Sequence, residues 1–202
     1  MKKGDATRAR ILDEAATQAS VRGLAAVSLN DVAEAIGLSK SGLFKHFRAK
    51  EAMQQAALEA TMGRFIQLVW EPLKAMPPGR AKVEAIFQRQ LDWVERECGP
   101  GGCLIQQASV ELDDQPGPLR EFLRQGQLRW QKTVRRELAA LREPPLSEEE
   151  AEQAYFEMKG IVMSFGEALR LFGDERARAR ANAAFEGLLA RTMRLQPPFV
   201  AL

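Results

Sequence analysis

The stretch "SLNDVAEAIGLSKSGLFKHFRAKE", residues 28–51, decides the expected fold, because it reads as two short helices joined by a turn around Gly37. Ser28 and Asp31 have the S-x-x-D spacing of a capping box and mark the start of the first helix. Ser39 is the expected N-cap of the second helix. Two capped helices with a glycine turn between them are typical of a helix-turn-helix, whose second helix enters the major groove of DNA.

The second of these helices, expected over residues 40–47, has two different faces. Leu43 and Phe47 lie four positions apart and point to one side, whereas Phe44 and Lys45 turn to the other. The first turn of a recognition helix usually reaches the base edges; here it consists of Lys40, Ser41 and Gly42. The pattern predicts a helix that packs on one side and meets phosphate on the other.

The charge distribution supports a polyanionic partner for this segment. The chain has a net charge of +2, but its first fifty residues alone carry +4 and the remainder carries −2. Basic charge gathered in one segment of a nearly neutral protein favours binding to nucleic acid. The alternative from these patterns alone is an ordinary helical hairpin with a solvated basic face.

The rest of the chain is also expected to be helical, because no strand-like alternation persists for more than a few residues. Glycines and prolines separate the expected helices, which cover residues 5–22, 28–37, 40–47, 50–75, 80–97, 103–113, 117–142, 147–172 and 174–195. The sequence therefore predicts an all-α fold of about nine helices. Residues 1–49 would form a helix-turn-helix DNA-binding domain, and residues 50–202 a helical ligand-binding and dimerisation domain.

Composition and motifs argue against several other classes of protein. No run of 18 apolar residues exists and the N-terminus lacks an apolar signal region, so we expect a cytoplasmic protein with no membrane contact. A single histidine, His46, leaves no partner for a histidine-based catalytic triad and no metal cluster. Since neither G-x-G-x-x-G nor a P-loop occurs, we expect neither an enzyme nor a bound cofactor.

Cys98 and Cys103 flank the flexible sequence Gly-Pro-Gly-Gly. The flexible loop could bring their sulfurs together, which makes a redox-sensing thiol pair one hypothesis. The other interpretation is that Cys103 is a small buried residue at a helix start and Cys98 lies at a helix end. A C-x4-C pair without further ligands is a poor zinc site.

Residues 7–53 resemble the N-terminal DNA-binding domain of the tetracycline-repressor (TetR) family of transcriptional regulators. The matching motifs are R-x-x-I-L at residues 8–12, the run that includes Val32, Ala33, Gly37 and Ser39, and L-F-x-H-F-x-x-K-E at residues 43–51. The resemblance implies a homodimer of all-helical subunits that binds inverted-repeat operator DNA. It also implies a variable C-terminal domain that binds an unidentified small-molecule effector, and release of a repressor from DNA when that effector binds.

The resemblance also places individual residues against DNA. The positions expected to face DNA are Ser28, Ser39, Lys40, Ser41, Gly42, Phe44, Lys45, His46 and Lys50. Phe44 stands where many relatives have tyrosine, so a hydroxyl that could reach phosphate is missing. Arg48 and Ala49 replace a common Pro-Ser pair, and the next helix therefore lacks a hydroxyl cap worth about 1 kcal/mol. A partly packed ring beside Phe47 is the alternative role for His46.

The last two expected helices carry wide apolar stripes that predict a dimer interface. The interface residues expected from these stripes are Ile161, Phe165, Leu169, Ala181, Phe185 and Leu188. Four such helices, two from each subunit, would form a bundle. In the alternative interpretation both stripes fill the core of the same subunit.

A ligand pocket is expected among residues 50–172. Its predicted lining is Phe65, Ile66, Val69, Phe87, Gln90, Cys103, Gln107, Glu111, Phe122, Trp130, Tyr155 and Met158. Gln107 and Glu111 are the polar members, one helical turn apart, and would suit a hydrophobic or cationic small molecule. They could instead be solvated. Two other functions stay open from the sequence: a thiol redox-sensing regulator that uses Cys98 and Cys103, and a helical interaction protein that does not bind DNA.

Overall fold

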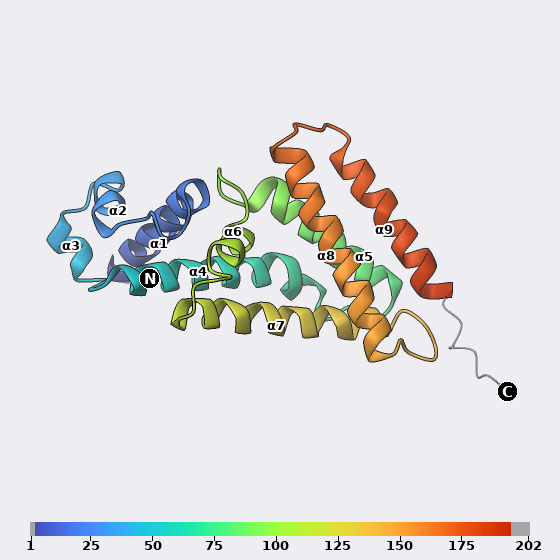
Figure 1. Ribbon diagram of the computed structural model, residues 1–202. Coiled ribbons are helices and arrows are strands. Elements are labelled where there is room, and N and C mark those ends of the chain that lie inside the picture. Colours follow the sequence, from blue (N-terminus) through green and yellow to red (C-terminus); the bar gives the residue numbers. More distant parts are fainter. Residues whose placement is uncertain (1–2, 195–202) are drawn as a thin grey trace. The chain divides into compact units, whose positions relative to one another are not determined.

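The computed structural model describes residues 3–194, and this part of the chain contains nine α-helices and no β-strand (Figure 1). The helices are α1 (Lys3–Arg22), α2 (Leu29–Ala35), α3 (Lys40–Phe44), α4 (Lys50–Phe65), α5 (Arg80–Asp92), α6 (Leu104–Glu111), α7 (Pro118–Ala139), α8 (Glu148–Arg170) and α9 (Ala177–Arg194). The predicted all-α fold is therefore confirmed. No helix within residues 3–194 is both long enough and apolar enough to cross a lipid bilayer.

Side-chain caps start the two short helices α2 and α3. The hydroxyl of Ser28 accepts a hydrogen bond of 3.1 Å from the Asp31 amide, and the hydroxyl of Ser39 accepts one of 3.1 Å from the Gly42 amide. The Asp31 carboxylate lies 3.4 Å from the guanidinium of Arg22, so this carboxylate links α2 to the end of α1. A cap of this kind satisfies an amide that the first turn of a helix leaves without a partner.

Two expected helices change their winding before they end. The helix expected over residues 50–75 stops being α-helical at Phe65, continues as the π-helical segment η1 (Ile66–Trp70), and ends in the 3-10 segment η2 (Glu71–Leu73). Pro72 explains the change, because proline lacks an amide hydrogen and its ring clashes with the carbonyl four residues earlier. Similarly, α5 passes into a second π-helical segment, η3 (Trp93–Glu97).

The chain divides into two compact units. Of the described residues, the first contains 3–68 together with 96–128, and the second contains 69–95 together with 129–194. This grouping differs from the predicted boundary between residues 49 and 50, which stays a prediction. Each unit has its own core.

In the first unit α1 packs against α2, α4 and α6, and α2 packs against α3. The fully buried side chains here include Ile11, Leu24, Leu43, Met53 and Leu58. Burial of such side chains contributes roughly 1.5–3 kcal/mol each relative to exposure. This core fixes α2 and α3 on α1 and α4, so the second helix of the helix-turn-helix has a rigid support.

In the second unit α8 and α9 pack along each other, and α5 packs on α8. The rings of Phe87 and Phe185 stack with their centroids 3.9 Å apart and their planes 10° from parallel. A buried ion pair joins Lys82 to Glu137 at 3.2 Å, and the Lys82 ammonium also lies 5.0 Å from the ring centroid of Trp70. These contacts tie α5 to α7, α9 and η1.

Candidate nucleic-acid interface

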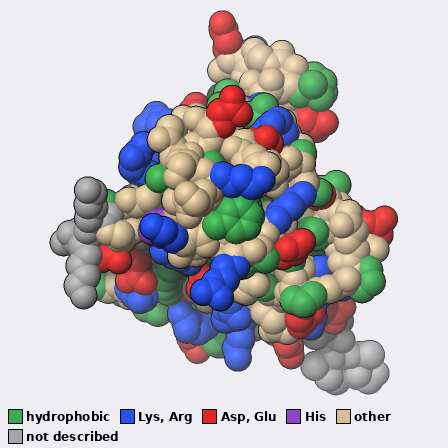
Figure 2. Space-filling view, turned by 90° about the vertical axis from the view of Figure 1, so that its left-hand side faces the viewer, with side chains coloured by type: hydrophobic (Ala, Val, Ile, Leu, Met, Phe, Trp, Pro, Cys, Tyr) green, Lys and Arg blue, Asp and Glu red, His purple; other side chains and the backbone are tan. Residues whose placement is uncertain are grey.

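Helix α3 presents opposite faces to the core and to solvent, as its sequence predicts. Leu43 and Phe47 are buried, whereas Lys40, Ser41 and Lys45 are exposed. The helix ends at Phe44, earlier than expected, because the amides of residues 46 and 47 both turn back to the Leu43 carbonyl. Figure 2 looks at the side of the molecule on which α2 and α3 lie and shows Lys and Arg side chains spread across that face, with acidic side chains also present.

Two arginines of α1 contact the α2–α3 segment. The guanidinium of Arg8 lies 4.3 Å from the ring centroid of Phe47, and Arg10 donates a hydrogen bond of 3.1 Å to the carbonyl of Ile36 at the end of α2. A cation over an aromatic face is attracted by the ring's quadrupole. These contacts position both ends of the α2–α3 segment against α1.

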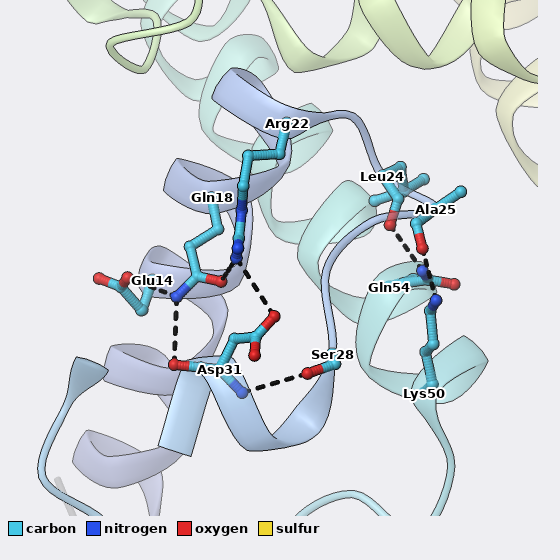
Figure 3. Close-up of polar contacts among 9 residues, drawn as sticks. All are labelled: Glu14, Gln18, Arg22, Leu24, Ala25, Ser28, Asp31, Lys50 and Gln54. Carbon is cyan, nitrogen blue, oxygen red and sulfur yellow. Dashed lines mark hydrogen bonds and ion pairs between the residues drawn. The ribbon is translucent and has the colours of Figure 1, made fainter. Parts of the chain in front are cut away.

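A second group of polar contacts joins α1 to the start of α2 (Figure 3). Gln18 donates to the Asp31 carbonyl at 3.3 Å and to the Glu14 carboxylate at 2.9 Å. Arg22 donates to the side-chain oxygen of Gln18 and pairs with the Asp31 carboxylate. Because the Asp31 amide also donates to the Ser28 hydroxyl that caps α2, the N-terminus of α2 is fixed to α1 through one residue.

The predicted DNA-facing residues divide into two kinds. Ser28 and Ser39 have their hydroxyls engaged as helix caps, and the backbone of Gly42 completes the second cap. The exposed side chains are Lys40, Ser41, Phe44 and Lys45, and Phe44 is 38% exposed. His46 is half-buried. An exposed aromatic ring between two lysines is available to contact the sugar–phosphate surface.

Lys50, predicted to face DNA, has a hydrogen-bond partner within the protein. Its ammonium donates to the carbonyl of Ala25 at 2.5 Å, and Gln54, one turn further along α4, donates to the carbonyl of Leu24 at 2.6 Å (Figure 3). Lys50 therefore holds the turn between α1 and α2. Its positive charge still lies in the basic segment, but its donor group is engaged within the protein.

Glu111, which was predicted to line a pocket, has its carboxylate bound to backbone amides of the first unit, and its place in a ligand site stays a prediction. Its carboxylate oxygens accept hydrogen bonds from the amides of Leu24 at 2.6 Å and Ala25 at 2.5 Å. The positive φ of Gly23, 85°, ends α1 and turns these two amides toward α6. A reading of helix faces could not reveal this contact, because the partner of Glu111 is backbone that lies more than eighty residues away in the sequence.

Gln107, the other polar residue predicted for the pocket, uses only half of its amide group. Its nitrogen donates to the carbonyl of Gly101 at 2.6 Å. Its oxygen is buried and has no hydrogen-bond partner within residues 3–194. A buried acceptor without a partner is costly, so this oxygen is suited to receive a hydrogen bond from a bound molecule.

The other predicted ligand residues are divided between the two units. In the first unit Phe65, Ile66 and Phe122 are half-buried and Cys103 is buried. In the second unit Val69, Phe87, Trp130, Tyr155 and Met158 are buried, and Gln90 is half-buried. Burial raises the pKa of the Tyr155 phenol to about 12, so this side chain is a neutral donor at physiological pH. Phe87 is committed to its stack on Phe185.

The residues predicted for the dimer interface lie largely inside one chain. Phe165, Ala181, Phe185 and Leu188 are buried in the second unit, and Ile161 and Leu169 are half-buried. Their burial needs no second subunit, which favours the alternative that both stripes fill the core of their own subunit. The exposed apolar side chains lie on the opposite face of α8 instead: Phe156 and Met163 in the helix and Leu171 at its C-cap.

Three functional features escaped the sequence interpretation. They are the anchoring arginines of α1, the use of Lys50 and Gln54 on the α1–α2 turn, and the carboxylate of Glu111. The only local signal was Gly23, which marks a helix end and leaves the following amides unpaired within the helix. Within the described part of the chain, no group of three or more His, Cys, Asp or Glu side chains is arranged to hold a metal ion.

Comparisons with known proteins agree with this geometry. Residues 11–57 match the family model described as "Bacterial regulatory proteins, tetR family", and residues 79–185 match the model described as "Tetracyclin repressor-like, C-terminal domain". The HTH-type transcriptional repressor KstR2 from Rhodococcus jostii (strain RHA1) is 34% identical over 92 residues, which span 44% of this chain and 43% of that protein.

Solved structures extend the similarity to nearly the whole fold. A TetR-family transcriptional regulator from Streptomyces coelicolor superposes with a TM-score of 0.78 at 20% identity, over 92% of this chain and 89% of that one. A TetR transcriptional regulator from Chloroflexus aurantiacus gives a TM-score of 0.76 at 26% identity, over 95% and 96%. The structure of AibR in complex with isovaleryl coenzyme A and operator DNA gives 0.74 at 18%, over 90% and 97%.

Proposed function

Because this chain belongs to the tetracycline-repressor family, we propose that it is a transcriptional repressor that binds an inverted-repeat operator as a homodimer and leaves it when a small molecule binds. The observation that carries the proposal is α3, a capped short helix with a buried apolar side and an exposed side of Lys40, Ser41 and Lys45. Such a helix can enter the major groove while its buried side stays on the protein. A protein with this function acts where the DNA is, in the cytoplasm.

In α3 and the residues that follow it, the exposed side chains have separate tasks. Lys40 and Ser41, in the first turn, face base edges and contribute to sequence preference, with the backbone at Gly42 close to the DNA. Lys45 and the exposed Arg48 contact phosphates, which adds affinity for any sequence. Phe44 packs against the sugar–phosphate surface in place of a hydroxyl contact.

The outer face of α8 supports the proposed dimer. Phe156, Met163 and Leu171, which we call the outer stripe, are 74%, 47% and 71% exposed. Their spacing along the helix brings them to one side, opposite the buried Met158 and Phe165. Exposed apolar side chains that line one helix face mark an interaction site. A second copy of the chain would cover the outer stripe in a bundle formed by α8 and α9 of both subunits.

The effector's chemical class is open, and Gln107 is the residue proposed to contact it. AibR was solved with isovaleryl coenzyme A, and another similar protein, a regulator from Saccharomonospora viridis, was solved with choline. At 18% and 19% identity these relatives support the fold rather than a ligand. The buried, unpartnered oxygen of Gln107 favours an effector with a hydrogen-bond donor.

The function is tested by selecting duplexes from a random DNA library with the wild-type protein and measuring affinity by fluorescence anisotropy. We expect an enriched inverted repeat, salt-sensitive binding, and a large preference over random DNA. Equal affinity for the selected and random duplexes at moderate salt would contradict the proposal. A thermal-shift screen of small molecules, followed by operator release from wild type and from Gln107→Leu, then tests the effector contact.

A thiol switch is a second candidate function, favoured by the loop before α6. Gly99 and Gly102 form an antiparallel bridge, so Cys98 and Cys103 lie next along its two sides. The bridge brings the two ends of this loop together, which favours the approach of the two sulfurs that a disulfide requires. A hydroperoxide would oxidise one thiol to a sulfenic acid, and the other thiol would displace water to form the disulfide.

Mass spectrometry after hydroperoxide treatment separates this candidate from the first. A mass loss of two hydrogens in wild type, absent from Cys98→Ser and accompanied by a change in operator affinity, would support the switch. Two thiols that both stay available for alkylation would exclude it.

A further inference from the structure

We propose that Glu111 is a positioning residue for DNA recognition: its carboxylate clamps the α1–α2 turn, so that the position of α6 fixes the position of the helix-turn-helix. The inference rests on the proposed function, because it assigns regulation to the same DNA-binding site. It concerns a residue of α6 that lies outside the helix-turn-helix segment, residues 28–51.

The clamp begins with the geometry of the turn. Gly23 has a φ of 85°, a conformation that L-residues with side chains rarely adopt, and its amide bonds back to Ala19 at 3.0 Å. The next two amides, of Leu24 and Ala25, both point at the Glu111 carboxylate. Successive amides that face one anion form a nest, and hydrogen bonds to a charged acceptor are about twice as strong as neutral ones.

The close approach of Glu111 also leaves little room for a side chain at Gly23. A Cβ at this position would lie 3.2 Å from the Oε2 atom of Glu111, tighter than an ordinary contact. Conformation and close approach therefore both favour glycine where the carboxylate meets the turn.

Side chains of α4 bind the carbonyls of the same two residues. The carbonyl of Leu24 accepts from Gln54 and the carbonyl of Ala25 accepts from Lys50. Both amides and both carbonyls of Leu24 and Ala25 are thus bound by side chains of α4 or α6. Such a turn cannot shift relative to these helices without breaking hydrogen bonds.

A second contact from the same region reaches the end of α1. The amide of Gly101, in the loop before α6, donates to the hydroxyl of Ser20 at 3.1 Å. A Cβ on Gly101 would lie 1.5 Å from the Ser20 carbonyl oxygen, so only glycine allows this approach. The side-chain amide of Gln107, in α6, donates to the carbonyl of Gly101 and so positions this glycine. The loop therefore contacts the end of α1, and α6 contacts the turn that follows α1.

The turn leads directly into α2. The amide of Val27 bonds to the carbonyl of Leu24 at 3.3 Å, and Ser28 caps α2 immediately afterwards. A movement of α6 must either carry the turn and the start of α2 with it or leave two amides without their carboxylate. The second outcome costs free energy chiefly at Leu24, which is buried, because an unpaired amide is unfavourable where it is shielded from water. Glu111 therefore transmits the position of α6 to the DNA-binding helices.

The test compares Glu111→Gln with wild type and with the control Glu121→Gln. Glutamine keeps the size of Glu111 but removes its charge and offers one oxygen to two amides. Glu121 is an exposed glutamate of the same unit, paired with Arg124, so its replacement makes the same chemical change away from the turn. The measurements are amide hydrogen exchange by NMR and affinity for the wild-type-selected duplex and for random DNA.

In Glu111→Gln we expect the amides of Leu24 and Ala25 to exchange about tenfold faster, because a charge-assisted hydrogen bond is lost. Affinity for the selected duplex should fall by about tenfold while affinity for random DNA stays within about twofold, because the phosphate-binding side chains are unchanged. In both variants the amides of α9 should exchange at the wild-type rate. The two DNA affinities of Glu121→Gln should equal those of wild type.

Glu111→Gln behaving like Glu121→Gln in exchange and in both affinities would overturn the inference. Faster exchange throughout α9, with equal losses for selected and random DNA, would also overturn it, because Glu111 would then serve stability alone. Failure of the wild-type protein to select any duplex would instead refute the proposed function. The exchange of Leu24 and Ala25 would still decide whether Glu111 holds the turn.

Discussion

Helices α3 and α8 both bury one face in their own unit and expose the other, but the exposed faces differ in chemistry. On α3 the outer side carries Lys40, Ser41 and Lys45 around one half-exposed aromatic ring. On α8 the outer stripe is apolar. The basic surface is stable in water without a partner, whereas an exposed apolar stripe gains free energy when it is covered.

An amphipathic pattern alone therefore does not identify an interface. In α8 the apolar residues that are easiest to read from the sequence form the core, and the interface candidate is the smaller stripe on the other side. In α3 the informative residues are the polar ones, because the apolar ones serve only packing.

Phe156→Glu in the outer stripe should give a folded monomer with weak operator binding. A charge at the centre of an apolar contact between subunits is strongly unfavourable, and loss of the second half-site contact removes an avidity of about 100-fold or more. Sedimentation measures the oligomeric state, circular dichroism the helical content, and fluorescence anisotropy the operator affinity. Leu128→Glu, at another exposed apolar position on α7, is the control and should stay dimeric. A dimeric Phe156→Glu protein with normal operator affinity would exclude the outer stripe as the interface.

Phe185→Ala, on the buried side, should act on stability instead of assembly. Removal of the ring leaves a cavity beside Phe87 and should lower the free energy of unfolding by about 3–5 kcal/mol. Urea denaturation measures the change. Phe44→Ala, at a residue that is 38% exposed, should cost about 1 kcal/mol or less. A small loss for Phe185→Ala, together with dissociation of the dimer, would restore the original interface prediction for this residue.

Local signals allowed most of the fold to be predicted. The caps at Ser28 and Ser39 lie within three residues of the amides that they bind, so the start of each helix could be read from the sequence. The ends were less accurate. The predicted helix over residues 50–75 includes Pro72, although this proline forces a change of winding. Helix α3 ends before its predicted limit because the amides that follow it converge on the Leu43 carbonyl.

The long-range contacts could not be predicted in the same way. Glu111 has the spacing of a pocket residue on α6, and nothing near it in the sequence indicates that its partners are the amides after Gly23. Lys50 fits the basic pattern of the DNA-binding segment equally well whether its ammonium meets phosphate or the Ala25 carbonyl. Only the packing of α1, α4 and α6 distinguishes these alternatives.

Lys45→Ala tests the basic surface of α3 and should have a moderate effect. Each phosphate contact contributes a salt-dependent free energy, so affinity should fall by about fivefold per subunit at physiological salt for selected and random DNA alike. The slope of log affinity against log salt should decrease by about one per subunit. Lys132→Ala removes an exposed lysine of the other unit and is the control. An unchanged salt slope in Lys45→Ala would remove this side chain from the interface.

Ser39→Ala should have the smallest effect and compares the caps of the two helices. The Ser39 hydroxyl caps α3, and the Ser147 hydroxyl caps α8 in a complete capping box with Glu150. Either replacement removes one hydrogen bond to a helix amide and should cost about 1 kcal/mol. In Ser147→Ala this cost should lower the free energy of unfolding and leave operator affinity unchanged. In Ser39→Ala the loss of the capping bond should fray the first turn of α3, where Lys40 and Ser41 lie. Operator binding should then weaken by about fivefold, which corresponds to the free energy of one capping bond. Equal operator affinities for the two variants would mean that the DNA itself orders the first turn of α3, and that the Ser39 cap serves only the folded protein.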